Sequence, residues 1–155
     1  MKGIVLAKGD YSYNKDMIEK YFPGANLRQG LIPTSMGEGH QMAMWIGAQM
    51  EKTPHARDLD FGKRPDRLTA VDTPPFYAHW NANPDNPMLI FGGLICNERL
   101  QPLDANGKAI PGLYLAGNTV GGCFKYAYPL LCPGISHGMA MTTGYLAGRF
   151  AFGLS

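Results

Sequence analysis

The stretch from Gly112 to Phe152 holds the residue types and spacing best suited to chemistry. A short apolar run, GLYLAG, ends at Gly117 and is followed by the polar Asn118. Pro-Gly-Ile-Ser-His then opens a helical pattern. The free N–H groups of a helix's first turn stabilise negative or electron-rich oxygen atoms. A glycine at the carboxyl end of a strand lets the backbone pass close to a ligand.

These two features predict a ligand site where a strand end meets a helix start. The candidate contacts are the residues of the two junctions: Gly117, Asn118, Gly134, Ile135, Ser136 and His137. The residues leave open a plainer interpretation, in which one junction is an ordinary turn and the other an ordinary capped helix.

The junction must be positioned by strands and helices that come earlier in the chain. Apolar runs predict short strands, and apolar residues at helical spacing predict helices. Strands are expected at 3–7, within 89–103 and at 113–116, and helices at 14–22, 38–50 and 136–152. Asn106-Gly107 favours a tight turn. The Pro-rich stretch 53–87 has no sustained period.

Three helix details follow from the pattern. Asn14 suits the N-cap of the first helix. Glu38 falls in the first turn of the second helix, where a carboxylate suits the positive end of the helix dipole. His40 is expected on that helix's surface. The residues expected to form the packed face of the second helix are Met42, Trp45, Ile46 and Met50.

Composition narrows the class of protein. The 155 residues are 45% hydrophobic and 17% charged with a net charge of +2, which is an ordered globular composition. No run of Lys or Arg supports nucleic-acid or membrane-surface binding, and no apolar run is long enough for a membrane span. Three cysteines without metal spacing favour reduced thiols in a cytoplasmic protein, and the four histidines predict no metal site.

Four segments, taken in order, resemble one family. They are KGIVLAKGDYSYN, MGEGHQMAMWIGA, FGGLICNERLQPLDANGKAIPGLYLAG and PGISHGMAMTTGYLAGR. Together they resemble the FAD-dependent fumarate reductase, succinate dehydrogenase and 3-ketosteroid dehydrogenase superfamily. The resemblance covers roughly residues 1–50 and 88–152. It implies an α/β fold, a partial Rossmann-like FAD-binding domain with its substrate-capping domain mostly absent.

The resemblance also implies roles for individual residues. Glu38 matches the acidic residue of a GDG turn that contacts the flavin nucleotide. Asn118 matches a glutamate that binds ribityl or ribose hydroxyls of FAD. Ser136 and His137 match backbone positions that face the pyrimidine edge of the flavin. A helix start there would stabilise negative charge on reduced flavin.

This sequence differs from the family motifs at positions that bind substrate, and these differences determine which substrate is expected. Dicarboxylate reductases carry a histidine before the Gly-Gly pair and an arginine in the glycine loop, whereas MLIFGG and CFKYAYPLLCPG carry neither. The YPLLCPG segment resembles the YPGPG of steroid dehydrogenases. This resemblance implies that Tyr128 polarises the carbonyl of an enone-like substrate and is the catalytic residue. A packed loop aromatic is the alternative, and Tyr126 is a nearby competitor.

Two functional hypotheses remain open. In the first, the chain is part of an FAD-dependent oxidoreductase that transfers hydride between flavin and an activated C=C or C–C bond. The GxGxxG fingerprint is absent from the sequence, so a partner chain or homo-oligomer would supply that half. In the second, the chain is a truncated, non-catalytic fragment or an interaction module. The expected divisions are 1–52 and 88–155 for the FAD-binding domain and 53–87 for a remnant of the capping insertion.

Overall fold

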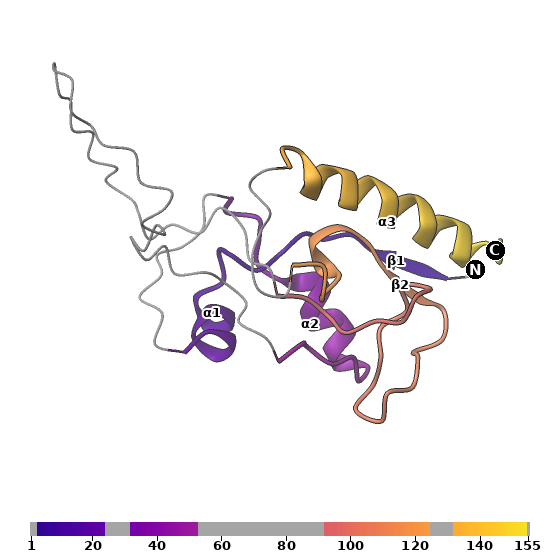
Figure 1. Cartoon of the computed structure of the whole chain (residues 1–155). Helices are drawn as coiled ribbons and strands as arrows, with labels where there is room; N and C mark the ends of the chain where they lie inside the picture. The colour runs from indigo at the N-terminus through magenta and orange to yellow at the C-terminus, as the bar shows by residue number, and fades with distance from the viewer. Residues whose placement is uncertain (1–2, 24–31, 53–91, 125–131, 155) are drawn as a thin grey trace, which may run out of the picture.

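The computed structural model describes residues 3–23, 32–52, 92–124 and 132–154 (Figure 1). Within these ranges the chain is α/β. Its elements, in order, are β1 (Ile4–Leu6), α1 (Lys15–Tyr21), α2 (Glu38–Trp45), β2 (Leu113–Leu115), the short 3-10 helix η2 (Gly117–Thr119) and α3 (Ile135–Ala151). None of the helices in these ranges is both long and apolar enough to cross a membrane.

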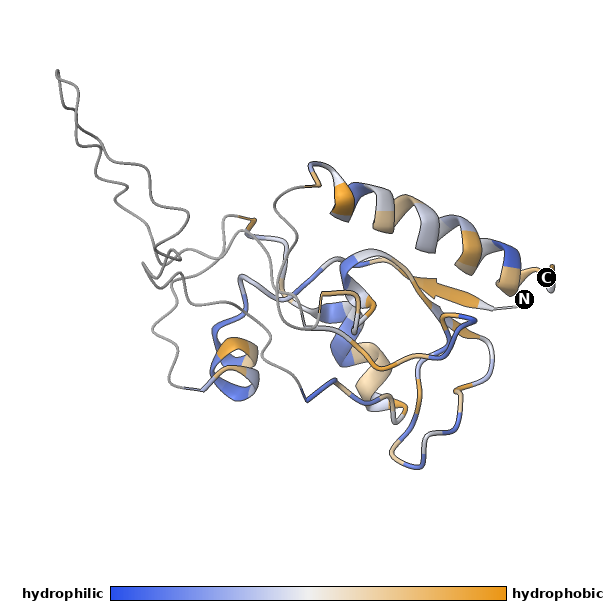
Figure 2. Cartoon of the chain, in the orientation of Figure 1, coloured by the Kyte–Doolittle hydropathy of each residue, from blue (hydrophilic) through white to orange (hydrophobic). Residues whose placement is uncertain are grey.

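The two strands pair in parallel and form the centre of the described fold. Ile4 lies opposite Leu113 and Leu6 opposite Leu115. Figure 1 shows α3 along one side of this pair and α2 on the other, and Figure 2 shows β1 as strongly hydrophobic. The main core cluster joins strand residues to Ala43 of α2 and to Leu94 and Val120 from the connecting segments.

The first helix forms as the sequence predicts, and slightly shorter. Asn14 is its N-cap, and its side-chain oxygen accepts a hydrogen bond from the N–H of Met17 at 3.1 Å. Met17 and Ile18 are buried and form a second core cluster with Tyr11. The apolar spacing of this segment therefore correctly identified its packed face.

The second helix is shorter than predicted and packs on a different face. It ends at Trp45 because Gly47 adopts a φ of 100°, and Met50 forms an isolated bridge with Leu94 instead of a last helical turn. The expected packed face is wrong, since Trp45 is 79% and Ile46 57% exposed. The helix instead buries its small and polar side, namely Gly39, His40 and Ala43.

The expected strands at 89–103 are isolated bridges over the described part, 92–103. Leu94 pairs with both Met50 and Val120, and Cys96 pairs with Pro102. Two consecutive glycines, Gly92 and Gly93, precede these short pairings and weaken a continuous strand. The predicted turn at Asn106-Gly107 is confirmed, because Gly107 has a φ of 75°.

The last helix begins one residue earlier than predicted. Its N-cap is Gly134, with a φ of 81°, and Ile135 is its first residue. Thr143 and Ala147 are its buried residues, and Arg149 lies in its last turn. The stretch 53–87 and the loop residues Tyr126 and Tyr128 lie outside the described residues.

Candidate functional site

Glu38 opens α2 immediately after a left-handed glycine. Gly37 has a φ of 75°, and an added Cβ there would lie 2.5 Å from Met17 Sδ. An added Cβ at Gly39 would lie 2.9 Å from Lys8 Cβ. Both glycines therefore serve close packing of the turn after β1 against the start of α2. Glu38, between them, lies in the first turn as predicted.

The Glu38 carboxylate is the strongest candidate for a ligand contact among the described residues. Its Oε2 atom is buried, and no hydrogen-bond partner for it is present among the described residues. A buried acceptor without a partner costs about 1–3 kcal/mol, and more when it is charged. A hydroxyl group of a bound nucleotide would satisfy this oxygen.

The η2 turn brings the start of α2 and the body of α3 together. Gly39 lies against Thr119, whose Cγ2 would be 3.7 Å from an added Cβ. The Thr119 hydroxyl donates to the carbonyl oxygen of Gly9 at 3.1 Å. On its other side, η2 contacts α3, because the N–H of Gly117 donates to Thr143 Oγ1 at 2.9 Å.

Gly117 and Asn118 have different surroundings within η2. Gly117 has a φ of 62°, and its N–H donates to Thr143 Oγ1, so a cofactor contact at Gly117 would be a close approach of its backbone rather than a hydrogen bond from this amide. Asn118 is half-buried, and its side chain makes no hydrogen bond with the described residues. The Asn118 amide is thus the polar group of η2 that is available to a ligand.

The start of α3 has the features of an anion-accepting helix end. Gly134 provides no side-chain cap, and the first turn carries no acidic residue. Ile135 and Ser136 are half-buried, while His137 is exposed. A 17-residue helix with an uncapped start presents the positive end of its dipole there.

The structure therefore brings some of the predicted site residues close together and leaves others apart. Glu38 and Asn118 belong to elements that meet at the Gly39–Thr119 contact. The second turn of α3 meets η2 at Ala140, whose Cβ would be 3.7 Å from an added Cβ on Gly117. Tyr128, the predicted catalytic residue, lies outside the described residues.

Sequence reasoning missed Glu51, which contacts two glycine segments. Its carboxylate accepts hydrogen bonds from the N–H groups of Gly93 at 3.0 Å and Gly122 at 2.9 Å. These partners lie 42 and 71 positions away in sequence, so no local motif signals them. The glycine pairs at 92–93 and 121–122 were the only available hint.

The surroundings of two further groups shift their pKa values. Burial, followed by the nearby Tyr21, Glu51 and Asp10, raises the pKa of Tyr11 far above its ordinary value. Burial first, then Cys123 and Glu51, raises the pKa of Cys96 to about 11. Both groups are therefore neutral at physiological pH and serve packing rather than nucleophilic chemistry.

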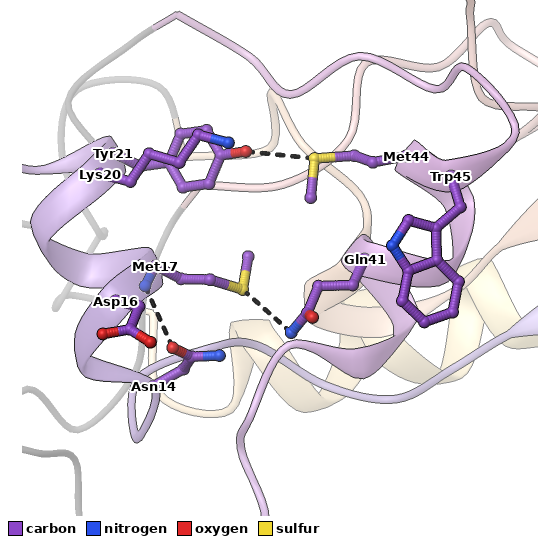
Figure 3. A pocket seen from close by; sticks show the side chains of 8 residues that line it. All are labelled: Asn14, Asp16, Met17, Lys20, Tyr21, Gln41, Met44 and Trp45. Atoms are coloured by element: carbon purple, nitrogen blue, oxygen red, sulfur yellow. Dashed lines mark hydrogen bonds between the residues drawn. The ribbon is translucent and has the colours of Figure 1, made fainter.

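A pocket among the described residues lies elsewhere, between α1 and α2 (Figure 3). It has a volume of about 370 Å³, and Tyr21 and Met17 of α1 face Met44 and Gln41 of α2 across it. The Tyr21 hydroxyl donates to Met44 Sδ at 3.2 Å. None of the predicted site residues lines it. No group of metal-binding side chains occurs within the described ranges.

Nucleotide-cofactor domains typically combine parallel strands with a helix start that is free to face the ligand. The described fold has both features, and it adds a buried carboxylate without a hydrogen-bond partner among the described residues. Comparison with known sequences makes the class specific, because the FAD binding domain family matches residues 51–135. The chain belongs to this family, within the fumarate reductase and succinate dehydrogenase-like flavoprotein superfamily, as its motifs predicted. Its cofactor is FAD.

Named relatives cover limited parts of the chain. Vinyl phenol reductase of Lactiplantibacillus plantarum is 36% identical over 63% of this chain, and 3-oxosteroid 1-dehydrogenase of Rhodococcus opacus is 39% identical over 53%. Digoxin reductase of Eggerthella lenta is 33% identical over 61%. The matched part spans 15–19% of the length of these relatives.

The described residues fit part of an FAD molecule. The unpartnered Oε2 of Glu38 suits a hydroxyl donor, and the half-buried amide of Asn118 suits a second hydroxyl. An added Cβ on Gly134 would meet none of the described residues within 4 Å. Asn118 replaces the glutamate that its motif resembles, which keeps an acceptor and removes a charge.

Proposed function

We propose that this chain forms the closing part of the cofactor domain of an FAD-dependent oxidoreductase that acts on an activated C=C or C–C bond. The observation that carries the proposal is the buried, unpartnered carboxylate oxygen of Glu38 in a member of the FAD binding domain family. Bound FAD would supply hydride exchange with the substrate carbon. The residues of this chain bind and orient the cofactor.

Each proposed contact has a defined task. Glu38 accepts a hydrogen bond from a hydroxyl of the nucleotide part, and Asn118 binds a ribityl or ribose hydroxyl. The backbone of Gly134, Ile135, Ser136 and His137 faces the pyrimidine edge, where the helix dipole stabilises negative charge. Gly117 keeps η2 close to α3 through its hydrogen bond with Thr143.

The proposed substrate is enone-like or steroid-like rather than a dicarboxylate. The four residues directly before Gly92-Gly93 include no histidine, and the loop 121–132 has no arginine. These residues therefore do not provide the cations that hold the carboxylates of a fumarate-type substrate. The three named relatives act, by their names, on vinyl phenol, 3-oxosteroid and digoxin. In this proposal Tyr128 hydrogen-bonds to the substrate carbonyl and assists proton transfer.

We further propose that β1 pairs with another parallel strand of a Rossmann-like sheet. Ile4 N–H donates to Gly112 and Ala116 N–H donates to Leu6, so the N–H and C=O of Val5 point to the opposite edge. No described residue pairs with that edge, and Ile4 is 53% exposed. A strand carrying the GxGxxG half, or a second copy of the chain, would cover it.

An interaction module without catalysis is the second candidate. It is favoured by large apolar side chains on the surface, with Trp45 79% and Met141 77% exposed. Surfaces of this kind often mark contacts with other protein segments. The residues 53–87 remain assigned, as a proposal, to the capping insertion between the two parts of the cofactor domain.

The test is FAD retention by the purified chain, followed by visible absorption after removal of free cofactor, with light scattering to measure the mass. We expect a flavin band close to one per chain, because the cofactor satisfies a buried acceptor. A mass above the monomer would support pairing at β1. A chain that retains no flavin at any mass would contradict FAD binding by this chain alone or with its own copies, and would leave a partner chain that carries the GxGxxG half, or the interaction module.

A further inference from the structure

Glu51 makes a bridge that the proposed cofactor contacts do not explain. Its Oε1 accepts the N–H of Gly93 at 3.0 Å, and its Oε2 accepts the N–H of Gly122 at 2.9 Å. Its own backbone N–H donates to the carbonyl oxygen of Gly93 at 3.0 Å. One residue thus exchanges two hydrogen bonds with one segment and reaches a second segment with its remaining oxygen.

The two bridged segments cross with their backbones in contact. An added Cβ on Gly93 would lie 2.5 Å from the nitrogen of Gly121, and one on Gly121 would lie 2.8 Å from the carbonyl carbon of Gly93. Side chains essentially never approach so closely, so the crossing requires glycine on both sides. The glycines themselves have no side chains to interlock, so hydrogen bonds hold them directly, beside the packing of their neighbours Leu94 and Val120 in the core.

The crossing is continuous with the η2 turn. Leu94 N–H donates to the carbonyl oxygen of Thr119, and Gly121 N–H donates to that of Leu94, both at 3.0 Å. The segment from Gly117 to Gly122 is therefore held at its start by Thr143 and at its end by Glu51. Asn118 lies between these two attachment points.

We propose that Glu51 is a positioning residue, whose carboxylate holds the crossing of the two glycine segments and so sets the position of Asn118 toward the cofactor. The inference rests on the proposed function. A carboxylate is required because both oxygens accept at once, whereas an amide has one accepting oxygen. Hydrogen bonds to an ionised acceptor are also stronger than those between neutral groups.

The electrostatics of the neighbouring thiol agree with a negative group at this place. Cys123 follows Gly122 directly, and its pKa is raised above the ordinary value, first by burial and then by Glu51. The Glu51 carboxylate therefore lies close enough to the second glycine segment to oppose another negative charge there.

The test compares the full chain with Glu51→Gln, and uses Glu98→Gln, an exposed glutamate, as the matched control. Amide exchange followed by NMR reports on Gly93 and Gly122 without cofactor. FAD titration, followed by flavin fluorescence far below the unfolding temperature, reports on positioning. We expect faster exchange at Gly122 and an FAD Kd raised about tenfold, from loss of one charge-assisted hydrogen bond. Glu98→Gln should change neither.

Several outcomes would overturn the inference. If amide exchange at Gly122 is unchanged in Glu51→Gln, the bridge is contradicted. If exchange is faster but FAD affinity is unchanged, the positioning role is contradicted. If Glu51→Gln does not fold, amide exchange in the unchanged chain tests the bridge. An N–H of Gly122 that exchanges without protection would contradict it. If the unchanged chain binds no FAD, Glu51 has no cofactor contact to position in this chain and the positioning role fails, while the exchange data still decide on the bridge.

Discussion

The buried oxygen of Glu38 is costly unless something binds it. Gly37 and Gly39 draw the turn after β1 so close to α2 that the carboxylate between them loses solvent on one side. The helix dipole offsets part of this cost, by about 0.3–1 kcal/mol. The rest of the cost is recovered only when a hydrogen-bond donor arrives, which is the expected behaviour of a binding residue rather than a folding residue.

Glu38→Gln separates these two roles. Because Oε2 is buried without a partner among the described residues, the substitution removes an uncompensated charge and should raise the unfolding midpoint of the FAD-free chain slightly. It should weaken FAD binding by about tenfold or more, since hydrogen bonds to charged groups contribute roughly 1.5–3 kcal/mol. Thermal unfolding and fluorescence titration measure the two quantities.

The control for Glu38→Gln is Glu19→Gln, an exposed substitution in α1. It should alter neither the unfolding midpoint nor FAD affinity. A Glu38→Gln chain that binds FAD like the unchanged chain would contradict the proposed nucleotide contact.

Among the described residues, the Thr143 hydroxyl makes the hydrogen bond that joins α3 to η2. Thr143 Oγ1 accepts from the N–H of Gly117 at 2.9 Å and donates to the carbonyl oxygen of Met139 at 2.7 Å. The hydroxyl thereby fixes how far along its axis α3 lies relative to the end of β2. Since the proposed flavin contacts lie at both the α3 start and η2, this hydrogen bond controls their spacing.

Thr143→Val should destabilise the chain by about 1–3 kcal/mol, because it leaves a partly buried N–H of Gly117 without an acceptor. Thr143→Ser keeps the hydroxyl and should recover most of that loss. Urea unfolding measures the difference. Thr142→Val, the same change at the exposed neighbouring position, serves as the control. A Thr143→Val chain as stable as the unchanged chain would contradict the role of the hydroxyl.

Two buried clusters stabilise the described fold, and each contains a group that resists ionisation. Tyr11 is fully buried in the cluster with Met17 and Ile18. Cys96 packs against the cluster of strand residues and Ala43. The folded chain raises both pKa values, so it holds these protons more tightly than the unfolded chain does.

This difference predicts a loss of stability in alkali. The contribution of each group is fully present below its ordinary pKa, 9.0 for Cys96 and 10.0 for Tyr11, and is lost as pH rises toward the folded-state value. The free energy of unfolding should therefore fall between about pH 8 and pH 11. Urea unfolding across this range measures it.

Tyr11→Phe removes one of the two ionisable groups and should make the alkaline loss smaller. Tyr145→Phe, on the exposed face of α3, should leave the loss unchanged. An equally steep fall in Tyr11→Phe would mean that Tyr11 does not ionise during alkaline unfolding.

Local sequence pattern correctly predicted the α1 cap at Asn14, the place of Glu38 in the first turn of α2 and the family, because caps, glycine turns and motifs act over a few residues. It was wrong for the packed face of α2. Apolar spacing predicted Trp45 inside and His40 outside, and the structure reverses both.

The reversal and the Glu51 bridge share one physical cause. The close approach of the turn after β1 favours the small side of α2, where Gly39 and Ala43 leave room for backbone contact. Glu51 meets glycines 42 and 71 positions away. Helical spacing describes which residues share a face, but only the packing of distant segments decides which face is covered and which carboxylate finds a partner.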